Sequence, residues 1–196
     1  ISLGLVGSEM CIRDRSMVEP KPSLILAVDL DNTLIKTDMI NVGIRFMLKY
    51  KIYLFPKLFW ILLTKGKPHA KKFLYDKSTF SIDNLVFNNS VVNFIKLNKG
   101  KYHQTILISG SYYKYVDAVA THINLFDSSV GTTEDINMIS LNKVEYLNNK
   151  YGNVIFDYIG DSKKDIPIWE VARTAYVVEN KNILNHIRHI NYHVIS

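Results

Sequence analysis

Two aspartates follow an apolar stretch in the first third of the chain. The run Leu24–Val28 is followed directly by Asp29, and Asp31 comes two residues later. Strand interiors disfavour Asp, and two carboxylates this close repel each other. The same pair can supply a nucleophile and a general acid, or oxygen ligands for a divalent cation. The spacing therefore predicts a reactive site at the end of a buried strand.

Polar residues also follow two later apolar runs. Ser109 comes after the run 105–108, and Asp161 comes shortly after the run 154–159. In an open parallel sheet, ligands bind in the crevice at the carboxyl ends of the strands. We therefore expect Asp29, Ser109 and Asp161, which are far apart in the sequence, to converge at one edge of the sheet.

Three of these aspartates offer the ligands of a hard cation. Carboxylates that crowd together are costly unless a cation binds them, and oxygen-only ligands suit Mg²⁺. Asp29 and Asp161 can each supply a carboxylate, and Asp31 can supply its backbone carbonyl. The sequence therefore predicts a magnesium site next to the paired aspartates.

A second group of residues can bind an anion. "SGS" at 109–111 stands where a helix is expected to begin, so the Ser109 hydroxyl and free backbone N–H groups, including that of Gly110, can hold an oxyanion. Lys143 opens the next expected helix and can neutralise charge that develops during a reaction. A metal, an anion site and a spare carboxylate together indicate phosphoryl transfer.

Strand and helix patterns alternate along the chain. Most of the apolar runs are continuous and β-branched, as expected of strands buried on both faces of a parallel sheet. The expected strands are Leu24–Val28, 105–108, 154–159 and 175–178. The expected helices are 91–97, 113–122, 143–149 and 165–173. The pattern predicts an α/β protein, a Rossmann-like parallel sheet flanked by helices.

The gap between the first two expected strands is much longer than one crossover connection needs. Residues 38–85 have the pattern of two or three helices, with breaks near Pro56 and at "KGKP". We interpret this segment as a small helical cap inserted after the first strand. The catalytic core is then expected to comprise residues 17–37 and 86–196.

The first residues differ in character from the rest of the chain. "EMCIRDR" at 9–15 looks like a translated sequencing adapter. We therefore interpret residues 1–16 as a non-native leader and expect the natural protein to begin at or near Met17. The single cysteine, Cys11, lies in this leader. Disulfides and cysteine-based catalysis are thereby excluded for the remaining residues.

The positive charge is concentrated in the expected cap. Residues 39–77 hold eight lysines and Arg45 against one acid, Asp76, a net charge of +8 in a chain of net +6. The other residues therefore carry a net −2, and a general nucleic-acid-binding surface is not indicated. No apolar run reaches the ~18 residues that a membrane span needs.

Aromatic residues accompany these lysines. Phe55, Phe59 and Trp60 are interpreted most simply as the core of the cap itself, because a helical cap needs an apolar face. An alternative stays open, in which the segment is an interfacial helix with its lysines near lipid phosphates and its rings at the headgroup level. That alternative predicts peripheral membrane contact through the cap.

Four stretches resemble, in order, the motifs of the haloacid-dehalogenase-like (HAD) superfamily, in its phosphatase branch. They are "DLDNTLIKTD", "LISGS", "LNKVEYL" with Lys143, and "IGDSKKD". A helical insertion after the first motif is typical of the phosphoserine-phosphatase-like members. "ATHINLFDSSVGTTEDINMISLNKVEYL" and "YIGDSKKDIPIWEVARTAYVV" also look like the HAD domain found N-terminal to UbiA-type prenyltransferases.

The resemblance implies catalytic roles for the first motif. Asp29 would attack phosphorus and form an aspartyl-phosphate. Asp31 would protonate the leaving oxygen and later deprotonate the hydrolytic water. Thr33 would orient this loop. The metal and Lys143 would separate the pKa values of the two carboxyls, so that one is ionised while the other can donate a proton.

The other motifs would hold phosphate and metal. The resemblance implies that Ser109 and Gly110, with Thr33 and Lys143, bind the substrate phosphate. Asp161 would bind Mg²⁺, and Asp165 would support the metal ligands or Lys143.

Together these observations predict a Mg²⁺-dependent phosphomonoester hydrolase. A phosphotransferase, an accessory domain serving a membrane prenyltransferase, and a nucleic-acid-binding protein are the alternatives, and the last rests only on the lysines. We expect a small phosphorylated substrate or a lipid-linked phosphate, such as a polyprenyl-linked sugar phosphate, and no nucleic acid. The expected location is the cytoplasm, with the membrane surface as the alternative.

Overall fold

The computed structural model describes residues 24–195, apart from residues 80, 153 and 179–180. The expected leader, residues 1–16, and the expected start at Met17 lie outside the described residues.

Six parallel strands form one sheet in the order β3-β2-β1-β4-β5-β6. The strands are β1 (Leu24–Val28), β2 (Gln104–Tyr112), β3 (Ser128–Thr132), β4 (Ile155–Gly160), β5 (Thr174–Val178) and β6 (Tyr192–Ile195). The predicted Rossmann-like α/β class is confirmed. The chain reverses its direction of travel across the sheet between β1 and β4, so the crevice outside these two strand ends is the expected ligand site.

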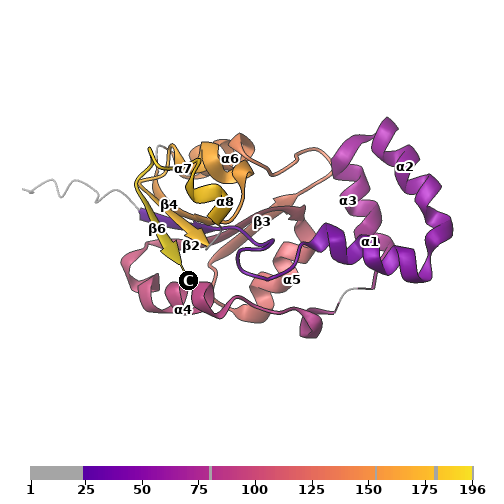
Figure 1. Ribbon diagram of the computed structural model, residues 1–196, viewed down its shortest axis with the longest axis horizontal. Helices are drawn as coiled ribbons and strands as arrows, with labels where there is room; N and C mark the ends of the chain where they lie inside the picture. The colour runs from indigo at the N-terminus through magenta and orange to yellow at the C-terminus, as the bar shows by residue number, and fades with distance from the viewer. Residues whose placement is uncertain (1–23, 80, 153, 179–180, 196) are drawn as a thin grey trace, which may run out of the picture.

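Helices cover both faces of this sheet (Figure 1). On one side lie α4 (Asn89–Asn98) and α5 (Tyr113–Ile123). On the other lie α6 (Leu141–Tyr151), α7 (Ile166–Trp169) and α8 (Lys181–Leu184). Alternate residues of β1 pack into the two helix layers, because successive side chains of a strand point to opposite faces of the sheet. Leu26 and Val28 pack with α4 and α5, whereas Ile25 and Ala27 pack with α6 and α7.

Some elements differ from the sequence-based expectation. Strands β3 and β6, at the two edges of the sheet, were not predicted. The expected helix 165–173 is shorter: a 3₁₀ turn, Lys163–Asp165, leads into α7, which ends at Trp169. The other predicted strands and helices are present, with ends that agree with the prediction or shift by up to four residues.

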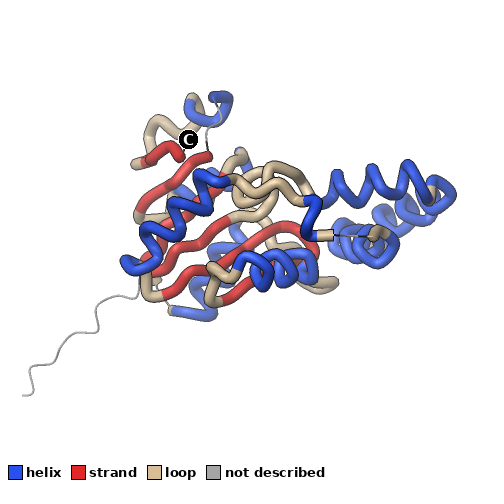
Figure 2. Tube along the Cα trace, turned by 90° about the horizontal axis from the view of Figure 1, so that it is seen from below, coloured by secondary structure: helices blue, strands red, loops and turns tan. Residues whose placement is uncertain are grey.

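A helical cap projects from the sheet between β1 and β2 (Figures 1 and 2). Its main helices are α1 (Met39–Tyr50), α2 (Phe55–Thr64) and α3 (Gly66–Lys77), with 3₁₀ turns at Ile52–Leu54 and Ile82–Asn84. Asp38 caps α1, since its side chain accepts hydrogen bonds from the backbone N–H of Ile40 and Asn41. The breaks fall where Pro56 opens α2 and where Gly66, at φ +82°, opens α3.

The cap has a small core of its own. Met47, Phe73 and Leu74 are buried there, and Phe55 packs against them with Leu58 and Ile61. The prediction that Phe59 and Trp60 also fill this core is wrong: their side chains are 62% and 68% exposed. They lie on the side of α2 that faces solvent. In the described part of the chain, none of the helices is long and apolar enough to cross a membrane.

Candidate active site

Asp29 stands at the end of the central strand, paired with a lysine. Its backbone N–H donates to Ile159 O at 2.9 Å, which continues the pairing of β1 with β4. The Nζ of Lys143, from α6, donates to Asp29 Oδ1 at 2.7 Å. Both side chains are buried. The predicted neighbours Asp29 and Lys143 are therefore brought together, 114 residues apart in the sequence.

Tyr158 links this ion pair to Asp165. Lys143 Nζ donates to the Tyr158 hydroxyl at 2.7 Å, and that hydroxyl donates to Asp165 Oδ1 at 2.8 Å. Asp165 Oδ2 accepts from the backbone N–H and the hydroxyl of Ser162. Gly160 leaves room for this arrangement, because a Cβ there would lie 2.8 Å from Asp165 Oδ2 and from Tyr158 Cε1.

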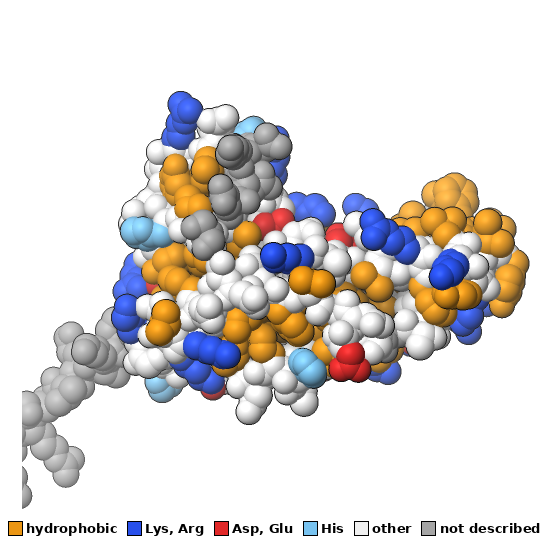
Figure 3. Space-filling model, turned by 60° about the horizontal axis from the view of Figure 1, so that its bottom comes forward, with side chains coloured by type: hydrophobic (Ala, Val, Ile, Leu, Met, Phe, Trp, Pro, Cys, Tyr) orange, Lys and Arg blue, Asp and Glu red, His pale blue; other side chains and the backbone are white. Residues whose placement is uncertain are grey.

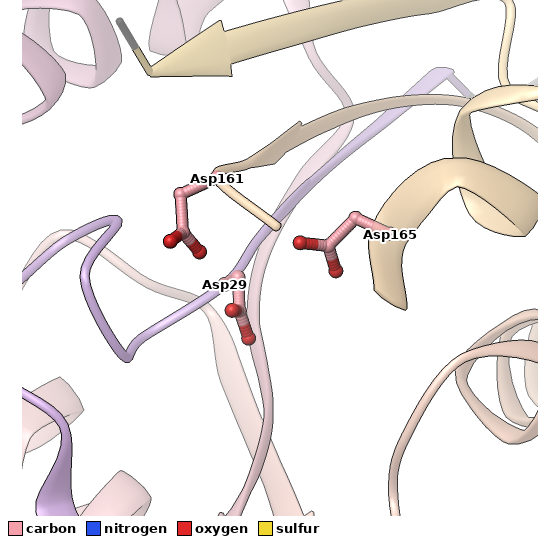
Figure 4. A group of neighbouring side chains, drawn as sticks. All are labelled: Asp29, Asp161 and Asp165. Atoms are coloured by element: carbon pink, nitrogen blue, oxygen red, sulfur yellow. The ribbon is translucent and has the colours of Figure 1, made fainter. Parts of the chain in front are cut away.

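Three carboxylates converge beside this network. Oxygens of Asp29, Asp161 and Asp165 all lie within 4.8 Å of one another, and Figure 4 shows the side chains meeting from the end of β1, the end of β4 and the turn before α7. Thr33 Oγ1 donates to Asp161 Oδ1 at 3.2 Å, which fixes the orientation of that carboxylate.

The charge of these carboxylates fits a divalent cation. Burial raises the pKa of Asp29, and the neighbouring Asp165 and Asp31 raise it further, whereas the Lys143 ammonium opposes the rise. Burial and Asp165 likewise raise the pKa of Asp161 to about 6. One lysine cannot neutralise three carboxyls this close together, two of them buried and one half-buried, so a hard dication bound by their oxygens would favour the ionised forms.

Asp31 is held through both of its oxygens. The backbone N–H of Met39 donates to Oδ1 at 2.8 Å. The hydroxyls of Ser111 and Ser109 donate to Oδ2 at 2.6 and 3.2 Å. Burial nevertheless raises the pKa of Asp31, so this carboxyl retains its proton to higher pH than an exposed aspartate. A positioned carboxyl of raised pKa suits a general acid.

A cavity of about 120 Å³ opens above these groups. Six predicted site residues line it: Asp29, Asp31, Gly110, Lys143, Asp161 and Asp165. Thr33 and Ser109 do not line it. They are fully buried and reach the site through their hydrogen bonds to Asp161 and Asp31.

Lys71 of the cap also lines this cavity, and the sequence analysis did not single it out. Its Nζ donates to Gly110 O at 2.5 Å and to Asn137 Oδ1 at 2.6 Å, and it lies 3.3 Å from Thr132 Oγ1. It is buried, unlike the half-buried Lys72 beside it. Burial lowers its pKa to about 8. In a sequence with so many cap lysines, only the fold distinguishes this one.

Tyr158 and Ser111 contact the site as well, and neither was among the predicted site residues. Ser111 belongs to the "SGS" stretch, so its neighbourhood was indicated by the sequence. Tyr158 lies within an apolar strand, where a tyrosine is ordinary core. In the sequence, the feature that connects Tyr158 with the site is its position two residues before Gly160 and three before Asp161.

Comparison with solved structures identifies the fold. A HAD family hydrolase from Salmonella enterica serovar Typhi superposes with a TM-score of 0.61 at 17% identity, over 88% of this chain and 68% of that chain. Phosphoserine phosphatase in its apo form superposes with a TM-score of 0.59 at 15% identity, over 90% of this chain and 94% of that chain. The chain has the HAD hydrolase fold.

Sequence comparison adds one relative. No family model matches the chain. The uncharacterized protein y4nM of Sinorhizobium fredii is 28% identical over 173 residues, which are 87% of this chain and 32% of the relative. The chain thus spans about a third of the length of this curated relative.

Proposed function

We propose that the protein is a Mg²⁺-dependent phosphomonoester hydrolase that works through an aspartyl-phosphate. The observation that carries the proposal is the position of Asp29: its carboxylate contacts the Lys143 ammonium, adjoins Asp161 and Asp165, and lines the same cavity as Asp31. A nucleophile, a charge-neutralising lysine, a cation site and an acid are thus within one small space. The HAD hydrolase fold, which phosphoserine phosphatase shares, supports this assignment.

The first half-reaction forms the covalent intermediate. An oxygen of Asp29 attacks phosphorus while the bond from phosphorus to the ester oxygen breaks. Asp31 gives its proton to that leaving oxygen, and the alcohol departs. Lys143 balances the charge of Asp29 before the attack and of the phosphoryl oxygens during it.

The second half-reaction returns the enzyme to its starting state. Asp31, now ionised, removes a proton from a water molecule as the water oxygen attacks phosphorus. The bond from phosphorus to Asp29 breaks, which releases inorganic phosphate and restores both carboxyls. The serines that donate to Asp31 keep it in one orientation for both proton transfers.

Magnesium would be held by Asp29 and Asp161, with Asp165 beside them, and when bound it would supply positive charge to the phosphoryl oxygens. The backbone carbonyl of Asp31 was a predicted ligand and stays a prediction. Asp165 has both oxygens engaged by Tyr158 and Ser162, so we assign it a supporting part.

The volume of the cavity bears on the size of the substrate. A volume of about 120 Å³ accommodates a phosphoryl group and a few further atoms, so a larger alcohol would extend past the cap. Phosphotransfer to an acceptor alcohol in place of water remains an alternative. The finer resemblance to HAD domains of UbiA-type prenyltransferases also stays a prediction, and so does a polyprenyl-linked sugar phosphate as substrate.

A substrate screen tests the proposal. The chain is assayed for phosphate release from phosphosugars, phosphoamino acids, nucleotides and lipid phosphates, with and without Mg²⁺. For at least one of these substrate classes we expect phosphate release that requires Mg²⁺ and that is lost in the Asp29→Asn variant. No release from any class, with a folded protein and Mg²⁺ present, would contradict the assignment.

A further inference from the structure

The far end of the cap exposes a group of large hydrophobic side chains, here called the apolar tip. Its members belong to the end of α1, the following 3₁₀ turn and α2. They are Leu48, Tyr50, Ile52, Tyr53, Phe59, Trp60, Leu62 and Leu63. Figure 3 shows hydrophobic side chains gathered at the end of the molecule that the cap forms, with lysine and arginine side chains among them. Contiguous apolar surface of this kind marks an interaction site.

Helix α2 is apolar on two sides. One side, Phe55, Leu58 and Ile61, packs into the core of the cap. The other side, which carries Phe59, Trp60 and Leu63, faces solvent. A surface helix ordinarily needs only one apolar stripe, because the opposite face is hydrated. The second side is therefore not explained by the folding of the cap.

The tip is separate from the candidate active site. The cap residues that line the cavity are Asp38 and Ile40, at the start of α1, and Lys71, in α3. None of the eight tip residues lines it. Substrate binding in the cavity therefore leaves the tip uncovered.

The segment that carries the tip is positively charged. Residues 39–75 contain no Asp or Glu. Exposed cations lie next to the apolar side chains: Arg45, Lys49, Lys57, Lys65 and Lys67. Lys49 lies over the ring of Tyr50, with Nζ 5.0 Å from the ring centroid, so charge and aromatic surface are directly adjacent.

We propose that the apolar tip docks on an anionic lipid surface. Tryptophan and tyrosine favour the headgroup level of a bilayer, where the ring is buried and the polar edge stays hydrated. Lysines beside them attract lipid phosphates. A projecting tip needs no matching groove in a bilayer, since lipids move aside to admit it. This inference does not depend on the proposed phosphatase activity.

A second copy of the chain fits the tip less well. Two such tips in contact would bring five or more cations of each copy together with no acid to pair them. Like charges brought together weaken an interface. At an anionic bilayer the electrostatic interaction is attractive instead of repulsive, so each cation strengthens the association.

Vesicle co-sedimentation tests the proposal. The chain is mixed with vesicles of phosphatidylcholine and phosphatidylserine in equal parts, or of phosphatidylcholine alone, at low and high salt. Binding to the anionic vesicles at low salt is expected, with weaker binding at high salt because the charges are screened. An absence of binding to anionic vesicles at low salt overturns the proposal, and so does equal, salt-independent binding to both vesicle types.

Two variants separate the apolar part from the charged part. Phe59→Ser combined with Trp60→Ser and Leu63→Ser is expected to lower partition into anionic vesicles by about tenfold or more. Lys49→Gln combined with Lys57→Gln, Lys65→Gln and Lys67→Gln is expected to lower it by about 100-fold or more, at roughly fivefold per cation. Circular dichroism and thermal unfolding verify that both variants fold.

Control variants change exposed apolar residues and exposed lysines outside the cap. Leu97→Ser with Val171→Ser removes exposed apolar groups outside the cap. Replacement of Lys36, Lys96, Lys101 and Lys150 by Gln removes the same number of exposed cations. Both controls are expected to bind vesicles like the parent chain. If they lose binding as strongly as the tip variants, or if the tip variants keep it, the tip is not the docking surface. A dimer that forms without vesicles and disappears in the Ser variant, with no vesicle binding, would assign the tip to a second copy.

Discussion

The ammonium of Lys143 lies 2.7 Å from Oδ1 of Asp29, and both side chains are buried at the end of β1. Removing one partner of such a pair ordinarily leaves an uncompensated buried charge, which is costly. Here Asp165 lies 3.7 Å from the same ammonium and Tyr158 accepts from it, so Lys143 keeps partners when Asp29 is replaced. The proposed nucleophile can therefore be tested in a folded protein.

Asp29→Asn is expected to lower phosphatase activity by several orders of magnitude, because the amide keeps the shape but cannot form the acyl phosphate. Turnover of p-nitrophenyl phosphate measures the loss, and circular dichroism verifies the fold. Asp135→Asn, at an exposed loop position, is the matched control and should retain full activity. Near-parental turnover in the folded Asp29→Asn variant would rule out the covalent route.

Magnesium is expected to stabilise the folded protein as well as support turnover. Binding at a concentration 100-fold above the dissociation constant adds about 2.7 kcal/mol to the free energy of unfolding. Thermal unfolding with and without EDTA measures this without any substrate. Asp161→Ala removes one of three converging carboxylates, so it should abolish the Mg²⁺-dependent shift, whereas Asp135→Ala should keep it. An unchanged shift in the Asp161 variant would place the cation elsewhere.

Asp31→Asn should affect substrates according to their leaving groups. p-Nitrophenolate departs without a proton, so formation of the phosphoenzyme should suffer less than with an alkyl phosphate. The second half-reaction still needs a base, so phosphoenzyme should accumulate, which rapid quenching and mass spectrometry detect. Equal losses with both substrates and no trapped intermediate would remove Asp31 from the acid–base role. Asp38→Asn, which also lines the cavity, is the comparison variant.

Lys71 gives a pH-dependent contribution to stability. Its pKa is lowered from 10.5 to about 8 in the folded protein, so between these values the unfolded chain holds the proton that the folded chain has lost. The free energy of unfolding therefore rises with pH from about 8 to about 10.5 on account of this residue. Below pH 8 both states are protonated and the contribution is constant.

Urea unfolding of the parent chain and Lys71→Met measures this effect. The difference in free energy of unfolding, parent minus variant, is expected to increase by about 2 kcal/mol between pH 7.5 and pH 10. Lys77→Met, which changes an exposed lysine of the same helix, is the matched control. A difference that stays flat across this range, or that shrinks as pH rises, would contradict the assignment.

The sequence predicted the centre of the sheet better than its edges. Leu24–Val28 is buried on both faces and has the continuous apolar pattern of such strands. β3, "SSVGT", is an edge strand of small residues with a single aliphatic side chain, and its first three residues are half-buried, so it lacks this continuous apolar pattern. β6 is the other edge and exposes His193 and Val194. An edge strand needs less apolar surface, so composition alone does not reveal it.

The candidate site was predictable where a strand end fixes it. Asp29 and Asp161 follow β1 and β4, and topology alone brings them together. Lys71 reaches the cavity from the cap, and its place depends on how α3 packs against the sheet, which no local pattern specifies. The exposure of Phe59 and Trp60 was mispredicted for a related reason. The sequence shows that these side chains are apolar, but whether another part of the chain covers them depends on how the cap helices pack.

The central position of β1 has a consequence for how the chain folds. β1 pairs with β2 only after the whole cap has been passed, and with β4 only after most of the chain. The hydrogen bond from Thr33 to Asp161 closes a separation of 128 residues. Contacts of such long sequence separation form slowly, because the chain loses conformational entropy on closing the loop before the new contacts stabilise the fold. During synthesis, a nascent chain that ends before β4 would contain the cap segment but lack Asp161 and Asp165, so the candidate site can assemble only after β4 and the turn that follows it have emerged.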